Sequence, residues 1–263
     1  MNSKYEISTK ENREFLKASC EELLNFGHRF PSPNGGSYYL GDDGTPWKDR
    51  NRETWITCRM AHVYSLGLML GHEGSEELAD AALKGLKGEL HDEKNGGWYA
   101  GVTPEGDIVP NKQCYAHAFV ILAASSALTA GRPGAKELLE EALAVYDRHF
   151  WNEEEGLACD TWNTEFTVLD DYRGLNANMH TVEAFLAAGD VTGDKKYHIR
   201  AGRIIDHVIQ WAEDNSWRIP EHFTKEWVAD LDCNRDRPDD PFKPYGATPG
   251  HGIEWARLIT QWT

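Results

Sequence analysis

The stretch GHEGSEELADAALKGLKGELHDEKNGGW, residues 71–98, recurs in altered form as GRPGAKELLEEALAVYDRHFWNEEEGL, residues 131–157. An offset of 60 residues aligns Gly71 with Gly131, and glycines, glutamates, leucines and alanines coincide along both copies. A weaker third copy, GDKKYHIRAGRIIDHVIQWAED, begins at Gly193. An internal repeat of this length predicts a chain built from similar supersecondary units that stack on one another.

Each copy has the pattern of a helix that buries one face. Apolar residues recur three and four positions apart, as at Leu78, Ala82 and Leu83, and charged residues fill the other side. The segments that precede the copies, residues 55–70, 115–130 and 178–188, are apolar on nearly every side, which is typical of fully buried helices. This alternation predicts an all-α toroid with inner and outer helices, joined by Gly-rich connections that add short strands.

The repeat also predicts how far the ring extends. At this period, residues 10–263 supply four hairpins and the inner helix of a fifth, which begins near His251. A closed (α/α)6 ring needs more chain, and the apolar pattern at residues 259–263 lacks a cap or a breaker. We therefore expect residues 1–263 to form a single, incomplete (α/α)6 domain that is truncated at its carboxyl end.

Composition excludes several classes of partner. The chain has 43 acidic and 27 basic residues, and its formal net charge of −16 would repel nucleic acid and anionic lipid. The charged amino terminus does not resemble a signal peptide, and the longest apolar stretch, residues 118–124, is too short to span a bilayer. We expect a cytoplasmic protein. Five widely separated cysteines predict free thiols rather than disulfides or a zinc site.

Polar side chains interrupt the predicted inner helices near their amino-terminal ends. A buried helix gains nothing from such residues unless they are paired or functional. In a toroid these ends can converge at one mouth of the central funnel, which predicts a polar site there. The residues concerned are Trp55, Arg59, Tyr115, His117, Asn176, Asn178, His180, Glu183, His251 and Glu254.

Two histidines of this set have a glutamate three positions later. His251 precedes Glu254 and His180 precedes Glu183, so on a helix each carboxylate can orient the imidazole or hold its proton. Local structural pairs and acid–base groups are equally compatible with this spacing. A zinc protease would need an HExxH motif, which the chain lacks, so we expect no metal.

Other polar residues have simpler interpretations. Arg59 needs an acid or an anionic ligand if it is buried, and either is compatible with the sequence. We expect His62 and His117 to be core histidines bonded to backbone carbonyls. Asp170 and Asp171 fit a loop cluster better than the acid pair of a glycosidase.

Five stretches occur in an order that resembles the N-acylglucosamine 2-epimerase superfamily, and most closely its branch of bacterial mannose and sulfoquinovose isomerases. They are WITCRMAHVYSLG (residues 55–67), NGGWYAGV (95–102), KQCYAHAF (112–119), DYRGLNANMHTVEAFL (171–186) and PYGATPGHGIEWARL (244–258). The resemblance covers almost the whole chain. It implies an (α/α)6 barrel, in agreement with the repeat.

The resemblance also implies a site and a reaction. Arg59, Tyr115, Asn176 and His180 would bind a sugar, Trp55 would shape the pocket wall, and His251 would be a catalytic acid–base group with Glu254 beside it. His180 is a second candidate for proton transfer. The implied activity is aldose–ketose isomerisation through a cis-enediolate, without a cofactor. The family's second catalytic histidine would lie beyond residue 263.

Alternatives remain open at this point. A 2-epimerase would share the proton abstraction, a polysaccharide-cleaving enzyme would use Asp170 or Asp171, and a non-catalytic toroid would bind sugar or protein without turnover. A 6-sulfo sugar would call for extra cationic contacts, for which Lys243 and Arg173 are candidates. Because either residue is equally compatible with a charge at the rim, we favour an uncharged hexose such as mannose. The sequence leaves homo-oligomerisation undecided.

Overall fold

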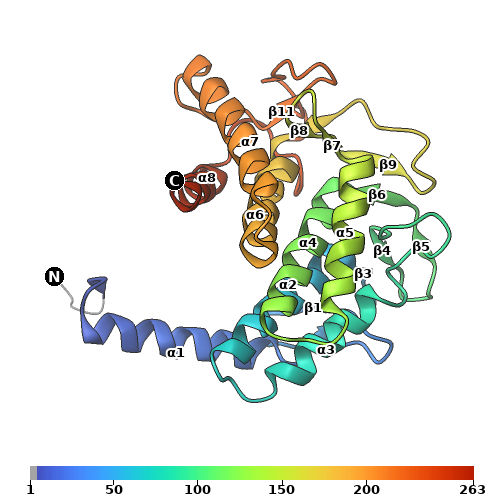
Figure 1. Ribbon diagram of the computed structural model, residues 1–263, viewed down its shortest axis with the longest axis vertical. Coiled ribbons are helices and arrows are strands. Elements are labelled where there is room, and N and C mark those ends of the chain that lie inside the picture. The colour runs from blue at the N-terminus through green and yellow to red at the C-terminus, as the bar shows by residue number, and fades with distance from the viewer. Residues whose placement is uncertain (1–4) are drawn as a thin grey trace.

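Helices alternate between two layers in the computed structural model, which describes residues 5–263 (Figure 1). The inner helices α2, α4, α6 and α8 pack against one another in order, and α3, α5 and α7 cover α2, α4 and α6 from outside. The helices are α1 (Lys10–Gly27), α2 (Thr54–Met69), α3 (Ser75–Leu86), α4 (Cys114–Thr129), α5 (Ala135–His149), α6 (Leu175–Thr192), α7 (Lys195–Asp214) and α8 (Pro249–Trp262). This arrangement confirms the predicted helical toroid architecture.

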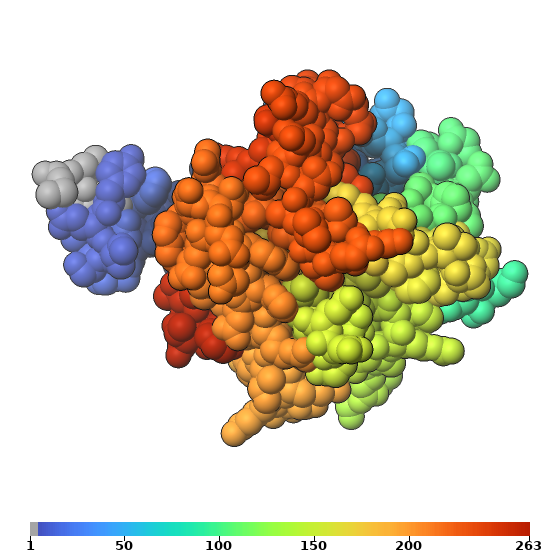
Figure 2. Space-filling model, turned by 90° about the horizontal axis from the view of Figure 1, so that it is seen from above, coloured from blue at the N-terminus to red at the C-terminus, as the bar shows by residue number. Residues whose placement is uncertain are grey.

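The arc of helices has α1 at one end and α8 at the other (Figure 1). The carboxyl-terminal part of α1 packs on α2, where the hydroxyl of Tyr64 donates to the carbonyl of Leu24 at 2.8 Å. The rest of α1 extends away from the body, as Figure 2 also shows. No helix among residues 5–263 is both long enough and apolar enough to cross a membrane.

The repeat arises from the turns that join inner to outer helices. Gly71 and Gly131 follow α2 and α4 with φ of 78° and 69°, and Gly193 ends α6 with φ of 71°. Gly74 and Gly134 are the N-cap residues that precede α3 and α5, again with positive φ. Because side chains are strained in this region of the backbone map, the same tight turn requires glycine at the same places.

Burial follows the predicted division between the layers. Helix α4 buries nearly every residue from Cys114 to Ala127, whereas α5 buries a single face formed by residues such as Leu138, Ala142 and Tyr146. The inner helices therefore form the hydrophobic core. Each outer helix shields one inner helix and presents its charged face to solvent.

Short antiparallel strands join neighbouring repeats. Strands β3 (Arg52–Glu53), β6 (Asn111–Gln113) and β10 (Arg173–Gly174) immediately precede α2, α4 and α6. Each pairs with a strand of the connection that leads to the next inner helix, namely β4 (Gly101–Val102), β9 (Thr161–Asn163) and β11 (His222–Phe223). The inner helices consequently begin at one common rim. The remaining strands are β1 (Tyr39–Leu40), β2 (Pro46–Trp47), β5 (Ile108–Val109), β7 (Trp151–Asn152) and β8 (Leu157–Ala158).

The predicted number of hairpins was wrong. Within residues 5–263, three inner–outer hairpins are complete, and α1 and α8 stand at either side of them. Residues 28–53 contain several glycines and prolines, among them Pro31, Pro33, Gly35 and Gly36, and they form turns and the short strands β1 to β3 instead of a further helix. The repeat period alone did not reveal this segment.

A fully buried ion pair supports the start of α4. The ammonium of Lys112 lies 2.9 Å from a carboxylate oxygen of Asp92, and neither side chain is accessible to solvent. Lys112 also donates to the carbonyl of Gly96 at 2.9 Å, and Asn95 donates to Asp92 at 2.9 Å. Burial alone would raise the pKa of Asp92, but the hydrogen bonds from Lys112 and Asn95 outweigh it and lower the pKa well below its usual range.

Replacing Lys112 with Met should therefore leave a buried carboxylate without its counterion. We expect the free energy of unfolding to fall by about 3–5 kcal/mol, measured by urea denaturation. Lys136→Met is the control, because Lys136 makes only an exposed pair with Glu140 at 3.8 Å, and it should change stability by less than about 0.5 kcal/mol. Equal effects of the two substitutions would contradict the importance of the buried pair.

Candidate active site

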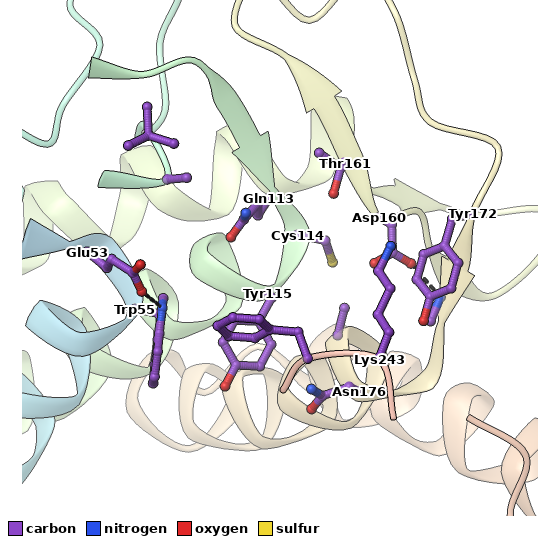
Figure 3. A pocket seen from close by; sticks show the side chains of 15 residues that line it. Glu53, Trp55, Gln113, Cys114, Tyr115, Asp160, Thr161, Tyr172, Asn176 and Lys243 are labelled. Carbon is purple, nitrogen blue, oxygen red and sulfur yellow. Dashed lines mark hydrogen bonds between the residues drawn. The ribbon is translucent and has the colours of Figure 1, made fainter. Parts of the chain in front are cut away.

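A cavity of about 220 Å³ lies where the inner helices begin (Figure 3). Trp55, Tyr115 and Asn176 line it, and each is the second residue of its helix, α2, α4 or α6. Phe242 and Lys243, from the loop that precedes α8, also line it. Since pockets for drug-sized ligands usually measure about 300–1,000 Å³, this cavity suits a smaller molecule.

One end of the cavity has an aromatic wall. The ring of Trp55 meets those of Tyr115 and Phe242 edge-on, with centroids 5.8 and 6.4 Å apart. The carboxylate of Glu53 accepts hydrogen bonds from the Trp55 indole and, at 2.7 Å, from the Tyr39 hydroxyl. Glu53 thus fixes the orientation of Trp55, a role that the sequence did not suggest.

Asn176 brings a polar group into the cavity lining. Its side-chain oxygen Oδ1 is buried and has no hydrogen-bond partner within the described part of the chain. Buried polar atoms are normally paired, so this oxygen is suited to accept a hydrogen bond from a ligand hydroxyl. The side-chain amide of Asn178, by contrast, is already paired with the backbone. Its oxygen accepts the N–H of Ala158 and its nitrogen donates to the carbonyl of Ala158, both at 2.9 Å.

Arg59 lies beside Tyr115, outside the cavity lining. Its guanidinium donates to the Tyr115 hydroxyl at 3.3 Å and lies 4.5 Å from the centroid of the Phe119 ring. The residue is exposed and makes no ion pair with any residue of 5–263. Because its charge stays hydrated, Arg59 does not need an acidic partner. A salt bridge, one of the two alternatives for Arg59, is not formed.

His180 packs against the same tyrosine. Its ring is 5.1 Å from that of Tyr115, and its Nδ1 lies 3.1 Å from a carboxylate oxygen of Glu183, which confirms the predicted His180–Glu183 pair. Glu183 also accepts a hydrogen bond from Arg257 at 2.7 Å. Burial alone would raise the pKa of Glu183, but His180 and Arg257 outweigh it and lower the pKa to about 2.

The predicted pairing of His251 with Glu254 was wrong. His251 Nδ1 instead lies 2.9 Å from Glu221, whose side chain is 5% exposed, while Glu254 is exposed on the surface of α8. The second oxygen of Glu221 accepts the backbone N–H of Thr248 at 3.1 Å, at the start of α8. Glu221 precedes β11, and the pairing of β11 with β10 brings it to this position from 30 residues upstream in the chain.

The pKa of His251 is raised above its ordinary value. The hydrogen bond to Glu221 is the main cause, burial opposes it, and the charges of Glu221 and Glu254 add to the rise. An ionised carboxylate can only accept hydrogen bonds, so His251 Nδ1 carries a proton and donates it as a hydrogen bond to Glu221. The neutral form of His251 therefore has its lone pair on Nε2.

Two other histidines have structural roles. His117 Nδ1 donates to the carbonyl of Gln113 at 2.7 Å and its Nε2 accepts from the Trp98 N–H at 3.1 Å, which confirms the expected core histidine. Burial lowers the pKa of His117 to about 3, so it stays neutral. The expectation for His62 was wrong, because its Nδ1 contacts the hydroxyl of Ser126 at 2.6 Å and not a backbone carbonyl.

Asp170 and Asp171 form a loop cluster, as the sequence favoured. Both are exposed, and Asp170 accepts the backbone N–H of Tyr172 at 2.8 Å. Neither lines the cavity. Among residues 5–263, no group of three or more histidine, cysteine, aspartate or glutamate side chains could hold a metal ion.

The sequence profile of N-acylglucosamine 2-epimerases matches residues 35–263, and the chain belongs to this family. D-mannose isomerase from Thermobifida fusca is 43% identical over 250 residues, which cover 94% of this chain and 61% of that protein. D-mannose isomerase from Pseudomonas cannabina pv. alisalensis is 40% identical over 254 residues, 96% of this chain and 61% of that protein.

Structural similarity agrees with these relatives. A crystal structure of a D-mannose isomerase superposes with a TM-score of 0.89 at 29% identity, and the alignment covers 98% of this chain and 66% of that one. The chain thus spans about 61% of the length of the two curated relatives. The mannose isomerase branch suggested by the sequence is confirmed.

The two carboxylates near His251 should affect its titration unequally. Glu221→Gln removes the hydrogen-bonded charge and should lower the pKa of His251 clearly, whereas Glu254→Gln removes only a more distant charge and should lower it less. The measurement is an NMR titration of the His251 ring, identified by its loss in His251→Asn. A larger drop with Glu254→Gln would restore the pairing that the sequence suggested.

Proposed function

We propose that this chain carries the sugar site of an aldose–ketose isomerase that converts mannose to fructose. The observation that carries the proposal is that two imidazoles with carboxylate partners lie on adjacent inner helices: His180 on α6, whose first turn lines the cavity, and His251 in the first turn of α8. Two relatives at 40% identity or more are named D-mannose isomerases. We also propose that the protein acts in the cytoplasm on a free monosaccharide.

Proton transfer between neighbouring carbons is the chemistry to be catalysed. Ring opening gives the free aldehyde, removal of the C2 proton gives a cis-enediolate, and return of a proton to C1 gives the ketose. An imidazole titrates near neutrality, so it can both take and return this proton. We assign this role to His251, with His180 as the second acid–base group.

Glu221 prepares His251 for this role. Since Nδ1 is bound to Glu221, Nε2 is the nitrogen that would face the substrate, and the carboxylate stabilises the imidazolium once the proton has been taken. Negative charge develops on the sugar oxygens at the same time. We assign its stabilisation to Arg59 and the Tyr115 hydroxyl, which are in contact at 3.3 Å, and Glu254 adds negative charge beside His251.

The remaining residues bind and shape the sugar. We assign Asn176 to a hydroxyl of the substrate because its Oδ1 is buried and unpaired, and Trp55 to the wall against which the sugar rests. A 2-epimerase would use the same groups but would return the proton to C2 from the opposite face. The names of the relatives favour isomerisation over this alternative.

Incubation of the chain with mannose in deuterated water should yield fructose with deuterium at C1. His251→Asn should reduce the rate by at least about 100-fold, as expected for loss of a general acid–base group. His28→Asn is the control, because His28 is exposed at the end of α1, and it should leave the rate unchanged. Formation of glucose alone would favour the epimerase, and mannose binding without any product would favour a binding module.

Asn176→Ala should weaken mannose binding by about tenfold, the effect of losing one hydrogen bond in a closed site. Asn25→Ala, in the exposed face of α1, is the matched control and should not change the dissociation constant. Isothermal titration calorimetry measures both. An unchanged affinity in Asn176→Ala would remove this residue from the sugar site.

A further inference from the structure

The end of the cavity opposite Glu53 and Trp55 has no role in the proposed reaction. Asp160, Tyr172 and Lys243 form it, and Figure 3 shows the Lys243 side chain extending toward Asp160 beside the Tyr172 ring. The imidazoles of His180 and His251 are not part of the cavity lining. If the reacting carbons lie beside these imidazoles, the cavity must hold the other end of the sugar, so this inference rests on the proposed function.

Contacts with neighbouring residues hold these three side chains in place. The Tyr172 hydroxyl lies 2.7 Å from His222 Nδ1, and His222 Nε2 donates to the carbonyl of Pro244 at 2.8 Å. The backbone N–H of Lys243 donates to Asp240 at 2.8 Å, and the Lys243 ammonium lies 3.5 Å from the centroid of the Tyr172 ring. This end of the cavity is therefore a built surface, with its lysine held over an aromatic face.

Asp160 supplies the acceptor of this surface. The N–H of Gly174 donates to its Oδ2 at 2.5 Å, and no donor within residues 5–263 occupies Oδ1. Burial raises the pKa of Asp160 to about 7, against the opposing effects of Gly174, Lys243 and Arg173. Arg173, once a candidate for contacting an anionic sugar, is buried and donates to the backbone carbonyls of Asp170 and Tyr172.

The charge of the lining disfavours an anionic sugar. Above about pH 7, where Asp160 is ionised, the cavity lining within the described chain has two carboxylates, Glu53 and Asp160, and one ammonium, Lys243. A sulfonate or phosphate placed there would lose its hydration without gaining an unopposed cation. The formal net charge of −16 acts in the same direction at long range.

We propose that Asp160 and Lys243 bind the C6 hydroxyl of the sugar, and that Asp160 makes this subsite selective for an uncharged C6 group. The Asp160 carboxylate accepts a hydrogen bond from the C6 hydroxyl, and the Lys243 ammonium donates a hydrogen bond to the oxygen of the same hydroxyl. Removing the carboxylate leaves the ammonium available to an anion.

Equilibrium binding to the intact chain tests this subsite without requiring turnover. The probes are D-mannose, 6-deoxy-D-mannose and the 6-sulfo sugar sulfoquinovose, and the variants are Asp160→Asn and Lys243→Met, with folding checked by thermal unfolding. Loss of the 6-hydroxyl should weaken binding to the unmodified chain by about tenfold, and by much less in Asp160→Asn. Asp160→Asn should tighten sulfoquinovose binding by about tenfold relative to the unmodified chain, whereas Lys243→Met should make it weaker than in the unmodified chain.

The outcomes separate this subsite from the reaction. If the 6-hydroxyl matters equally in Asp160→Asn and the unmodified chain, or if sulfoquinovose affinity is unchanged, the subsite assignment is overturned even if fructose is formed. If the Asp160-dependent pattern is found but no ketose forms, the assignment stands and the isomerase proposal fails.

Discussion

The antiparallel pairing of short strands between neighbouring repeats is the constraint on which the site depends. Strands β3, β6 and β10 each end where an inner helix begins, and each pairs with a strand of the following connection. This pairing holds the first turns of α2, α4 and α6 at one rim, so that Trp55, Tyr115 and Asn176 line the same cavity. The β10–β11 pair also carries Glu221 to His251.

A carboxylate partner is what distinguishes the rim histidines from those of the core. His117 is bonded only to backbone groups, and burial lowers its pKa to about 3, which removes it from acid–base chemistry near neutrality. His251 is also partly buried, but the hydrogen bond to Glu221 raises its pKa. His251 is less buried than His117 and has a carboxylate partner, so its pKa is raised whereas that of His117 is lowered.

Local sequence patterns predicted the features that depend on one helix or one turn. Repeat spacing, the two helix layers and the His180–Glu183 pair all follow from residues within one repeat. Asp160 and Glu221 could not be recognised, because they act on residues that only the fold brings near. Glu53 lies two residues from Trp55, but no local pattern indicated that its side chain turns back to the indole. The missing hairpin has another origin, because residues 28–53 form turns and short strands before α2, as residues 87–113 and 150–174 do before α4 and α6.

A crystal structure of the chain with mannitol would test the central claim, that the inner-helix rim binds a sugar with its reacting carbons beside the imidazoles. Mannitol is the open-chain alcohol of mannose and cannot isomerise. The account predicts C1 or C2 within about 3.5 Å of His251 Nε2, the geometry needed for proton transfer, and the remainder of the chain in the cavity beside Asn176. Mannitol bound away from this rim, or with no carbon near His251, would contradict it.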